Sequence, residues 1–346
     1  MPRGGAHFSS EELAQVLSHY DIGIITQVKP HSAGNKRAPK MVITSEEGKF
    51  LLKRRQRGKD DFYRVAFAHA VQTHLAKSHF PVAALVATCD EHNTILQLDS
   101  HIYELFKFVA GARYDGTAEA TADAGRQLAG FHQYLADFAC RTGTIGEELK
   151  GSFHDSATVR RHLKTVGADK MAGPEKRLQA IAEALMALYN GCSVQVNELG
   201  FDSWDQQIVH GDWHPGNMLF ARGKLTAVLD FDSVKVAPPI TDMANGMLQF
   251  SIVGNRPNPA DWPAYLDQAK LIQFLNGYRK VIKLDKYKLR ALLDLMIETM
   301  IAEAVLPVAA TGFFGNLSGL DFLKMIRRKA EWIDKNRKKL DEAMRN

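Results

Sequence analysis

Residues 208–232 read IVHGDWHPGNMLFARGKLTAVLDFD, a stretch in which polar side chains stand at the ends of short apolar runs. The apolar runs 218–220 and 225–229 are separated by a glycine-containing turn, which predicts a β-hairpin. Hairpin geometry would bring Asn217, just before the first strand, next to Asp230, just after the second. Amide and carboxylate oxygens held side by side are hard ligands of the kind that Mg²⁺ prefers.

Three polar blocks follow one another here in a recognisable order. His210, Asp212 and Asn217 have the mutual spacing of the His-Arg-Asp-Leu-x-x-x-Asn loop of protein kinases, and Asp230-Phe231-Asp232 stands where Asp-Phe-Gly would follow. Together with Thr241-Asp242-Met243-Ala244, this segment resembles the aminoglycoside phosphotransferase and choline kinase-like family. The resemblance implies an α+β fold of the bilobal protein-kinase-like type, with a small antiparallel-sheet N-terminal lobe and a mainly helical C-terminal lobe.

The resemblance also implies a reaction and roles for individual residues. The chain would use ATP and Mg²⁺ to phosphorylate a hydroxyl group of a small molecule, such as an aminoglycoside, choline, homoserine or a sugar-like acceptor. Asp212 would accept or orient the proton of that hydroxyl, while Asn217 and Asp230 would hold Mg²⁺ against the phosphates. His210 and His214 would brace the loop, and Asp242 would tie it to the helical lobe. Asp232 would be a supporting residue that offers a further metal or water ligand.

The chain before this segment is typical of a nucleotide-binding lobe. Residues 1–105 are rich in short strand-like runs, whereas residues 106–346 are mainly helical and hold the catalytic loop and the expected acceptor pocket. Phe50-Leu51-Leu52-Lys53 matches the Val-Ala-Ile-Lys pattern of the strand that binds phosphate in kinases. By resemblance, Lys53 would therefore hold the α- and β-phosphates.

Two further segments complete the expected nucleotide site. Residues 32–35 resemble the Gly-x-x-Asn-type loop of the family, whose backbone N–H groups cradle phosphate. Residues 101–111 stand where the hinge between the lobes binds adenine in the family. The residues assigned to the nucleotide on these grounds are Ser32, Gly34, Asn35, Glu104, Phe106 and Phe108.

One expected feature is missing from the N-terminal lobe. The helix predicted over residues 61–78 should carry a glutamate near Ala68 or His69 to pair with Lys53, yet no acidic residue lies between Asp61 and Asp90. The sequence does not say which group takes its place. A catalytically weak or silent nucleotide-binding module therefore remains an alternative.

Composition excludes several other classes of protein. The 346 residues include 44 Lys or Arg and 39 Asp or Glu, for a net charge of +5, and 45% are apolar, so a disordered or fibrous chain is excluded. The apolar stretch 301–314 is too short to span a bilayer, and the chain begins without the apolar core of a secretory signal. Three widely spaced cysteines predict no disulfide framework. We therefore expect a cytoplasmic enzyme with no membrane partner.

Further alternatives concern the partner molecule. The basic stretch 321–344 predicts a solvated helix, and a nucleic-acid partner is not clearly indicated. A protein Ser/Thr kinase is less favoured, because Gly211 and Asp232 replace the arginine of His-Arg-Asp and the glycine of Asp-Phe-Gly. Glu298 and Glu303 are candidates for an amine-binding acceptor pocket, but the sequence does not identify the acceptor.

Overall fold

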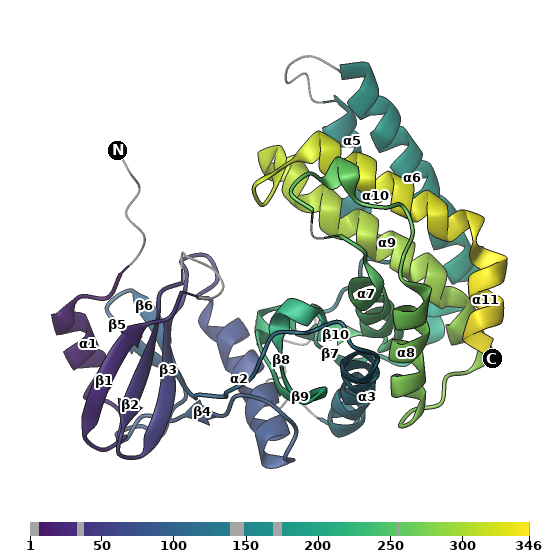
Figure 1. Ribbon diagram of the computed structural model, residues 1–346. Coiled ribbons are helices and arrows are strands. Elements are labelled where there is room, and N and C mark those ends of the chain that lie inside the picture. Colours follow the sequence, from purple (N-terminus) through teal and green to yellow (C-terminus); the bar gives the residue numbers. More distant parts are fainter. Residues whose placement is uncertain (1–6, 33–37, 139–148, 169–174, 255, 346) are drawn as a thin grey trace.

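The computed structural model describes residues 7–32, 38–138, 149–168, 175–254 and 256–345. It has the bilobal α+β architecture expected from the sequence, with a sheet-rich lobe joined to a larger helical lobe (Figure 1). Within the described residues, none of the helices has the length and apolar character needed to cross a membrane.

The N-terminal lobe is built on one antiparallel sheet in the order β1-β2-β3-β6-β4, with β5 also paired to β6. Its strands are β1 (Ile25–Pro30), β2 (Lys40–Ser45), β3 (Gly48–Arg54), β4 (Leu85–Val86), β5 (Leu96–Leu98) and β6 (His101–Lys107). The predicted hairpin of β2 and β3 is present, and its register places Lys53 opposite Lys40. On the other edge of β3, Lys53 lies opposite Glu104 of β6.

Two helices flank this sheet. Helix α1 (Ser10–Leu17) begins with a capping box, in which Ser9 and Glu12 satisfy each other's free backbone N–H groups. Helix α2 (Phe62–Lys77) begins at the N-cap Asp61, as the sequence predicts. Most of the apolar face of α2 packs into the core of the C-terminal lobe. Val65, near the start of the helix, packs instead with Ile95 and Ile102 of the N-terminal lobe. Helix α2 therefore couples the two lobes.

The connection between the lobes is hydrogen-bonded to the hairpin of residues 218–228, which follows the loop of Asp212. Strand β6 continues to Lys107, past the boundary expected between residues 105 and 106. Beyond it, Ala112 exchanges two backbone hydrogen bonds with Phe220, both of 2.8 Å. A Cβ at Gly111 would lie 2.7 Å from the Leu219 side chain, so the close approach requires glycine.

The C-terminal lobe is mainly helical. Its α-helices are α3 (Ala118–Leu135), α5 (Ala157–Ala168), α6 (Glu175–Glu198), α7 (Ile240–Ser251), α8 (Gln268–Arg279), α9 (Lys286–Thr311), α10 (Gly319–Lys335) and α11 (Arg337–Arg345). Short 3₁₀ turns are η1 (Phe201–Ser203), η2 (Pro215–Asn217), η3 (Phe231–Ser233) and η4 (Pro259–Asp261). Three two-stranded sheets complete the lobe, pairing β7 (Gln207–Val209) with β10 (Lys235–Ala237), β8 (Met218–Ala221) with β9 (Lys224–Val228), and β11 (Phe313–Phe314) with β12 (Leu317–Ser318).

The basic C-terminal stretch differs from its predicted form. It is expected as one helix over 321–344 but forms α10 and α11, which separate at Asn336. Its cations are also less solvated than expected. Lys329 is 1% exposed and donates to the backbone oxygens of Val253, Pro263 and Tyr265 at 3.0, 2.8 and 3.3 Å. Part of this positive charge therefore anchors α10 to the loop after α7.

Helices α3 and α8 cross at unusually short range because glycines face each other's backbone. A Cβ at Gly125 of α3 would lie 2.0 Å from the carbonyl oxygen of Phe274, and one at Gly277 of α8 would lie 1.9 Å from that of Ala122. Real Cβ atoms do not approach so closely, and backbone cannot yield as a flexible side chain can. The crossing brings His132 and Tyr278 together beneath the catalytic loop.

We predict that Gly125→Ala lowers the free energy of unfolding by about 1–3 kcal/mol or more, because the added methyl group overpacks this crossing. Gly191→Ala is the matched control, since that glycine lies in helix α6 with open space around its Cβ position. The control should raise stability by up to about 1 kcal/mol through helix propensity alone. Urea unfolding of both variants measures the difference, and equal changes would contradict the close-packing account.

Candidate functional site

Asp212 lies on the loop between β7 and η2, where its carboxylate is held from two sides. The Asn217 side-chain amide donates to Asp212 Oδ2 at 2.9 Å, and His214 Nε2 lies 3.5 Å from the same oxygen. The Asp212 side chain remains 38% exposed. The carboxylate is therefore oriented and still open to a ligand.

The charge of Asp212 is stabilised by these neighbours. Burial by itself would raise its pKa, but the hydrogen bond and charge of His214 and the Asn217 amide outweigh burial and lower the pKa below its ordinary value. The pKa of His214 moves the other way: burial opposes its charge, but Asp212 raises the pKa above the usual value. Asp212 is consequently a carboxylate at neutral pH, able to accept a hydrogen bond.

The loop that carries Asp212 is anchored by the buried carboxylate of Asp242 on α7. Asp242 accepts the backbone N–H of His210 at 2.6 Å and that of Gly211 at 2.8 Å. His132 of α3 lies 3.3 Å from the same carboxylate and is itself hydrogen-bonded to Tyr278 at 2.9 Å. Asp242 thus links the loop to three helices, and these contacts are of the kind that the resemblance implies for it.

Glycine between His210 and Asp212 is a geometric requirement of this loop. Gly211 has φ +74°, and a Cβ there would lie 2.4 Å from the backbone oxygen of Ser233. This explains why the chain departs from the His-Arg-Asp pattern at that position. His210 is fully buried against the rings of Phe131, Trp213 and Phe231, consistent with a bracing role.

The hairpin of β8 and β9 brings Asn217 and Asp230 together. The backbone N–H of Leu229 donates to the backbone oxygen of Asn217 at 2.8 Å, which places the start of one strand beside the end of the other. Asp230 is exposed and left-handed, with φ 60° and ψ 78°, an uncommon conformation for a non-glycine residue. Strain of this kind clusters at ligand sites, and here it presents a carboxylate beside an amide.

These two side chains fit a magnesium ion that is also held by phosphate. Asn217 donates its amide nitrogen to Asp212, which turns the amide oxygen away from that carboxylate. Asp230 is exposed and follows Leu229, whose backbone is bonded to the backbone of Asn217. Among the described residues no cluster of three His, Cys, Asp or Glu could hold a metal alone. An amide oxygen and a carboxylate are hard ligands of the kind that Mg²⁺ accepts, usually together with substrate phosphates.

Cations face this pair from the N-terminal lobe. Lys53 lies 3.9 Å from Asp232, and Arg55 forms a closer ion pair with the same carboxylate. Lys40 lies in the same charged region. Burial and then the positive charge of Lys53 lower the pKa of Lys40, and the charges of Asp230 and Asp232 oppose this shift only in part. Asp232 therefore bridges the lobes, which is a different contact from the metal or water ligand considered from the sequence.

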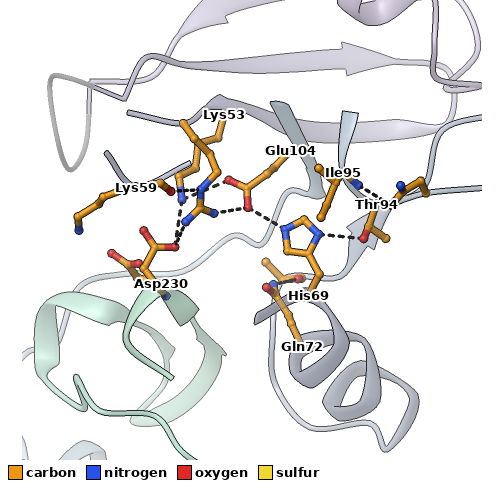
Figure 2. Close-up of polar contacts among 12 residues, drawn as sticks. Lys53, Lys59, His69, Gln72, Thr94, Ile95, Glu104 and Asp230 are labelled. Carbon is orange, nitrogen blue, oxygen red and sulfur yellow. Dashed lines mark hydrogen bonds and ion pairs between the residues drawn. The ribbon is translucent and has the colours of Figure 1, made fainter. Parts of the chain in front are cut away.

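Glu104 is the carboxylate that contacts Lys53, at 3.3 Å (Figure 2). It also pairs with Arg55 at 2.6 Å and with His69 Nε2 at 2.8 Å. The sequence assigned Glu104 to the nucleotide as part of the hinge whose backbone binds adenine in the family, and that contact stays a prediction. The Glu104 side chain is only 2% exposed and is engaged in this cluster. Arg55 and His69 were missed. The available signal was the alternation along β3, which predicts that Lys53 and Arg55 share a face.

The other residues assigned to the nucleotide lie near the lobe connection or outside the described part. Phe106 is half-buried in β6, and Phe108 donates its N–H to the Lys49 oxygen at 2.9 Å. Phe108 also meets the ring of His31 edge-on, just before the exposed Ser32. Gly34 and Asn35 lie outside the described residues. Contact of these residues with a nucleotide stays a prediction.

A hollow beside the catalytic loop forms the other side of the site. Its lining includes Gly211, Lys235, His154 and Glu298. Glu298 is fully buried and bonded to His154 at 2.9 Å and to Ser193, so this candidate from the sequence is committed to the scaffold.

Glu303 differs from Glu298, although both lie on α9. Its two carboxylate oxygens accept the amides of Asn245 and Gln249, each at 2.7 Å. Burial, followed by the negative charge of Asp212, raises the pKa of Glu303 to about 7. Glu303 is therefore an acid electrostatically coupled to the catalytic loop, poised to ionise near neutral pH.

A family model described as "Phosphotransferase enzyme family" matches residues 27–282 of the chain. No curated protein matches the sequence significantly. The matched segment begins in β1 and extends beyond α8, so it covers the sheet, the catalytic loop and the helices that support it.

Solved structures match the chain over nearly its whole length. The microcompartment-associated aminopropanol kinase has a TM-score of 0.71 and 14% identity, covering 96% of this chain and 99% of that one. The aminoglycoside phosphotransferase from Alicyclobacillus acidocaldarius has a TM-score of 0.69 and 17% identity, covering 99% of each chain. Amicoumacin kinase, solved with AMP-PNP, Ca²⁺ and Ami, has a TM-score of 0.67 and 14% identity, covering 95% and 94%. These likenesses show the protein-kinase-like fold.

We predict that Glu303 makes stability fall as pH rises from about 4.5 to about 7. In this window the unfolded chain releases the Glu303 proton while the folded chain retains it, so rising pH favours unfolding. Glu303→Gln removes that titration and should gain up to about 3 kcal/mol relative to the unsubstituted protein across the window. Unfolding free energies measured at several pH values test this. The exposed Glu183→Gln is the control, and parallel pH profiles for protein and Glu303→Gln would contradict the assignment.

Proposed function

The chain belongs to the phosphotransferase enzyme family, and we propose that it transfers the γ-phosphate of ATP to a hydroxyl group of a small molecule in a Mg²⁺-dependent reaction. One observation carries this proposal. Asp212 is an exposed, ionised carboxylate held by Asn217 and His214, and the same Asn217 is bound through its backbone to the residue before Asp230. A proton acceptor and a pair of metal-ligating groups thus share one short loop and hairpin.

The proposed role of Asp212 follows from its charge and position. A hydroxyl group of the acceptor would donate a hydrogen bond to the Asp212 carboxylate, which aligns its oxygen for in-line attack on the γ-phosphorus. As the new P–O bond forms, the bond between the γ-phosphorus and the β–γ bridging oxygen would break, ADP would leave, and the hydroxyl proton would pass to Asp212. Asn217 and His214 keep the carboxylate in a single orientation, and Asp242 keeps the whole loop in place.

The phosphates would be bound from both lobes. Lys53 would contact the α- and β-phosphates from β3, and Asn217 and Asp230 would bind Mg²⁺ from the hairpin. Mg²⁺, when bound, neutralises negative charge on the phosphate oxygens. Amicoumacin kinase, which has a similar fold, was solved in complex with AMP-PNP and Ca²⁺, and this supports a nucleotide and a divalent cation as ligands here.

The acceptor side favours a molecule that carries an amine as well as a hydroxyl. Glu303 is an acid with its pKa near 7 beside the negatively charged Asp212, and an ammonium group placed there would stabilise its ionised form. Aminoglycosides and amino alcohols share this chemistry.

The proposed setting is the reducing cytoplasm, which suits the free thiols of Cys89 and Cys192.

The alternative of a silent nucleotide-binding module rested on the missing glutamate of α2. Its support weakens because Lys53 has a carboxylate partner in Glu104. The partly exposed Asp212 carboxylate, held by Asn217 and His214, also supports catalysis over a silent module.

We predict that Asp212→Asn lowers phosphotransfer by about 10²–10⁴-fold, because an amide cannot accept the hydroxyl proton. The assay is ADP release from MgATP with a panel of amino alcohols, amines, aminoglycosides and sugars. Binding of MgATP, measured by thermal shift, should be retained. Asp202→Asn, an exposed residue of η1, is the control and should keep full activity. Equal rates for Asp212→Asn and the unsubstituted protein with every acceptor would refute the assignment of Asp212.

We also predict that Asp230→Asn raises the Mg²⁺ concentration needed for half-maximal activity at least about tenfold, because it removes a charged ligand. Titrating MgCl₂ at a fixed, saturating ATP concentration measures this requirement. Asp202→Asn again serves as the control. An unchanged Mg²⁺ requirement in Asp230→Asn would show that Asp230 does not bind the metal.

A further inference from the structure

Helix α2 offers His69 at the position where a kinase-like lobe is expected to supply a glutamate. We propose that Glu104, which lies on β6 rather than on α2, is the residue that positions Lys53 for nucleotide binding, and that Arg55 extends its influence to the metal-binding turn. This inference rests on the proposed function and adds positioning residues to it.

The sheet itself brings Glu104 to Lys53. The two residues are directly opposite each other in the antiparallel ladder of β3 and β6, and side chains at such positions share one face of a sheet. Their charged atoms lie 3.3 Å apart, and Glu104 is 2% exposed while Lys53 is 17% exposed. This contact is built by strand register alone, so it does not depend on where a neighbouring helix sits.

Helix α2 still contacts the pair, but with a donor instead of an acid. His69 Nε2 lies 2.8 Å from Glu104 Oε1, and an ionised carboxylate can only accept, so Nε2 carries the proton. The other ring nitrogen, Nδ1, lies 2.8 Å from the Thr94 hydroxyl oxygen. Figure 2 shows Glu104 between Lys53 and His69, with Asp230 approaching from the other lobe. The histidine therefore orients the carboxylate that orients the lysine.

Arg55 connects the same carboxylate to the C-terminal lobe. It pairs with Glu104 at 2.6 Å, forms an ion pair with Asp232 and donates to the backbone oxygen of Lys59 at 2.7 Å. Asp232 belongs to the turn that holds Asp230, and its backbone N–H points to Asp230 Oδ1 at 3.5 Å. One buried carboxylate thus bears on both the phosphate-binding lysine and the metal-binding turn.

The charges explain what the loss of Glu104 would do. Lys53 and Arg55 are two cations that share the carboxylates of Glu104 and Asp232. Without the charge of Glu104, Asp232 is the remaining carboxylate within reach of both cations. The ammonium group of Lys53 would then be drawn toward Asp232 and away from the position in which it would contact the phosphates. The expected defect is in nucleotide binding and turnover, with acceptor binding left intact.

The test uses the isosteric variant Glu104→Gln in the full-length protein. We expect a rise of at least about tenfold in the KM for MgATP together with a lower kcat, and an unchanged KM for the acceptor. The double variant Glu104→Gln/His69→Glu returns a carboxylate to the cluster from α2 and should recover part of the loss. Calorimetric titration with MgADP follows nucleotide affinity without any acceptor, and thermal unfolding confirms that each variant is folded.

A matched control is Glu12 of α1, whose partner Arg54 is the residue after Lys53 on β3. Glu12 pairs with Arg54 at 2.6 Å, outside the cluster around Lys53, so Glu12→Gln removes a similar ion pair and should leave both KM values unchanged. A folded Glu104→Gln with normal MgADP affinity and normal kinetics would overturn the proposal, and so would a double variant no better than the single one. If the unsubstituted protein bound no MgADP, the proposed function would fail with it; if that protein bound MgADP and Glu104→Gln bound it equally well, only the present inference would fail.

Discussion

The carboxylate of Asp242 is the contact on which the rest of the site depends. It is buried and accepts two backbone N–H groups of the catalytic loop, while His132 of α3 and, through it, Tyr278 of α8 approach it from below. Burial disfavours its charge, but His132, His210 and the N–H of Gly211 more than compensate, so its pKa is lowered. Such a group is costly to leave unpaired, so the loop and the helices hold one arrangement together.

A second buried carboxylate, Glu104, plays the matching part in the N-terminal lobe. Asp242 organises backbone within one lobe, whereas Glu104 organises side chains that reach across both, through Lys53 and Arg55. The protein therefore separates two tasks. The loop of Asp212 is held because its backbone is bonded to helix α7, whereas the spacing between the groups proposed to bind phosphate and metal is set by ion pairs between the lobes.

Two glutamates of helix α9 differ in their surroundings. Glu298 is consumed by the scaffold, while Glu303, five residues further along the same helix, is coupled to Asp212 and has its pKa raised to about 7. Helix α9 thus carries one acid that pairs with His154 and Ser193 and another that is held by two amides and is influenced by the charge of Asp212. Structures with 14–17% identity share this fold while their named acceptors differ. The shared fold therefore does not identify the acceptor, and under the proposed function Glu303 is a candidate for selecting it.

The sequence by itself determined the local parts of this protein. The apolar pattern and turn of residues 218–229 predict the hairpin that joins Asn217 to Asp230, because both depend on neighbouring residues. The order of the polar blocks carries the family resemblance, and the resemblance implies the bilobal fold. The sequence could not identify the partner of Lys53, the role of Arg55 or the difference between Glu298 and Glu303. Those depend on the register of β3 with β6, the closure of the lobes and the packing of α9, and each pairs residues distant in the chain. Only the tertiary structure decides such contacts, because side-chain periodicity predicts which face a residue occupies but not which residue it meets there.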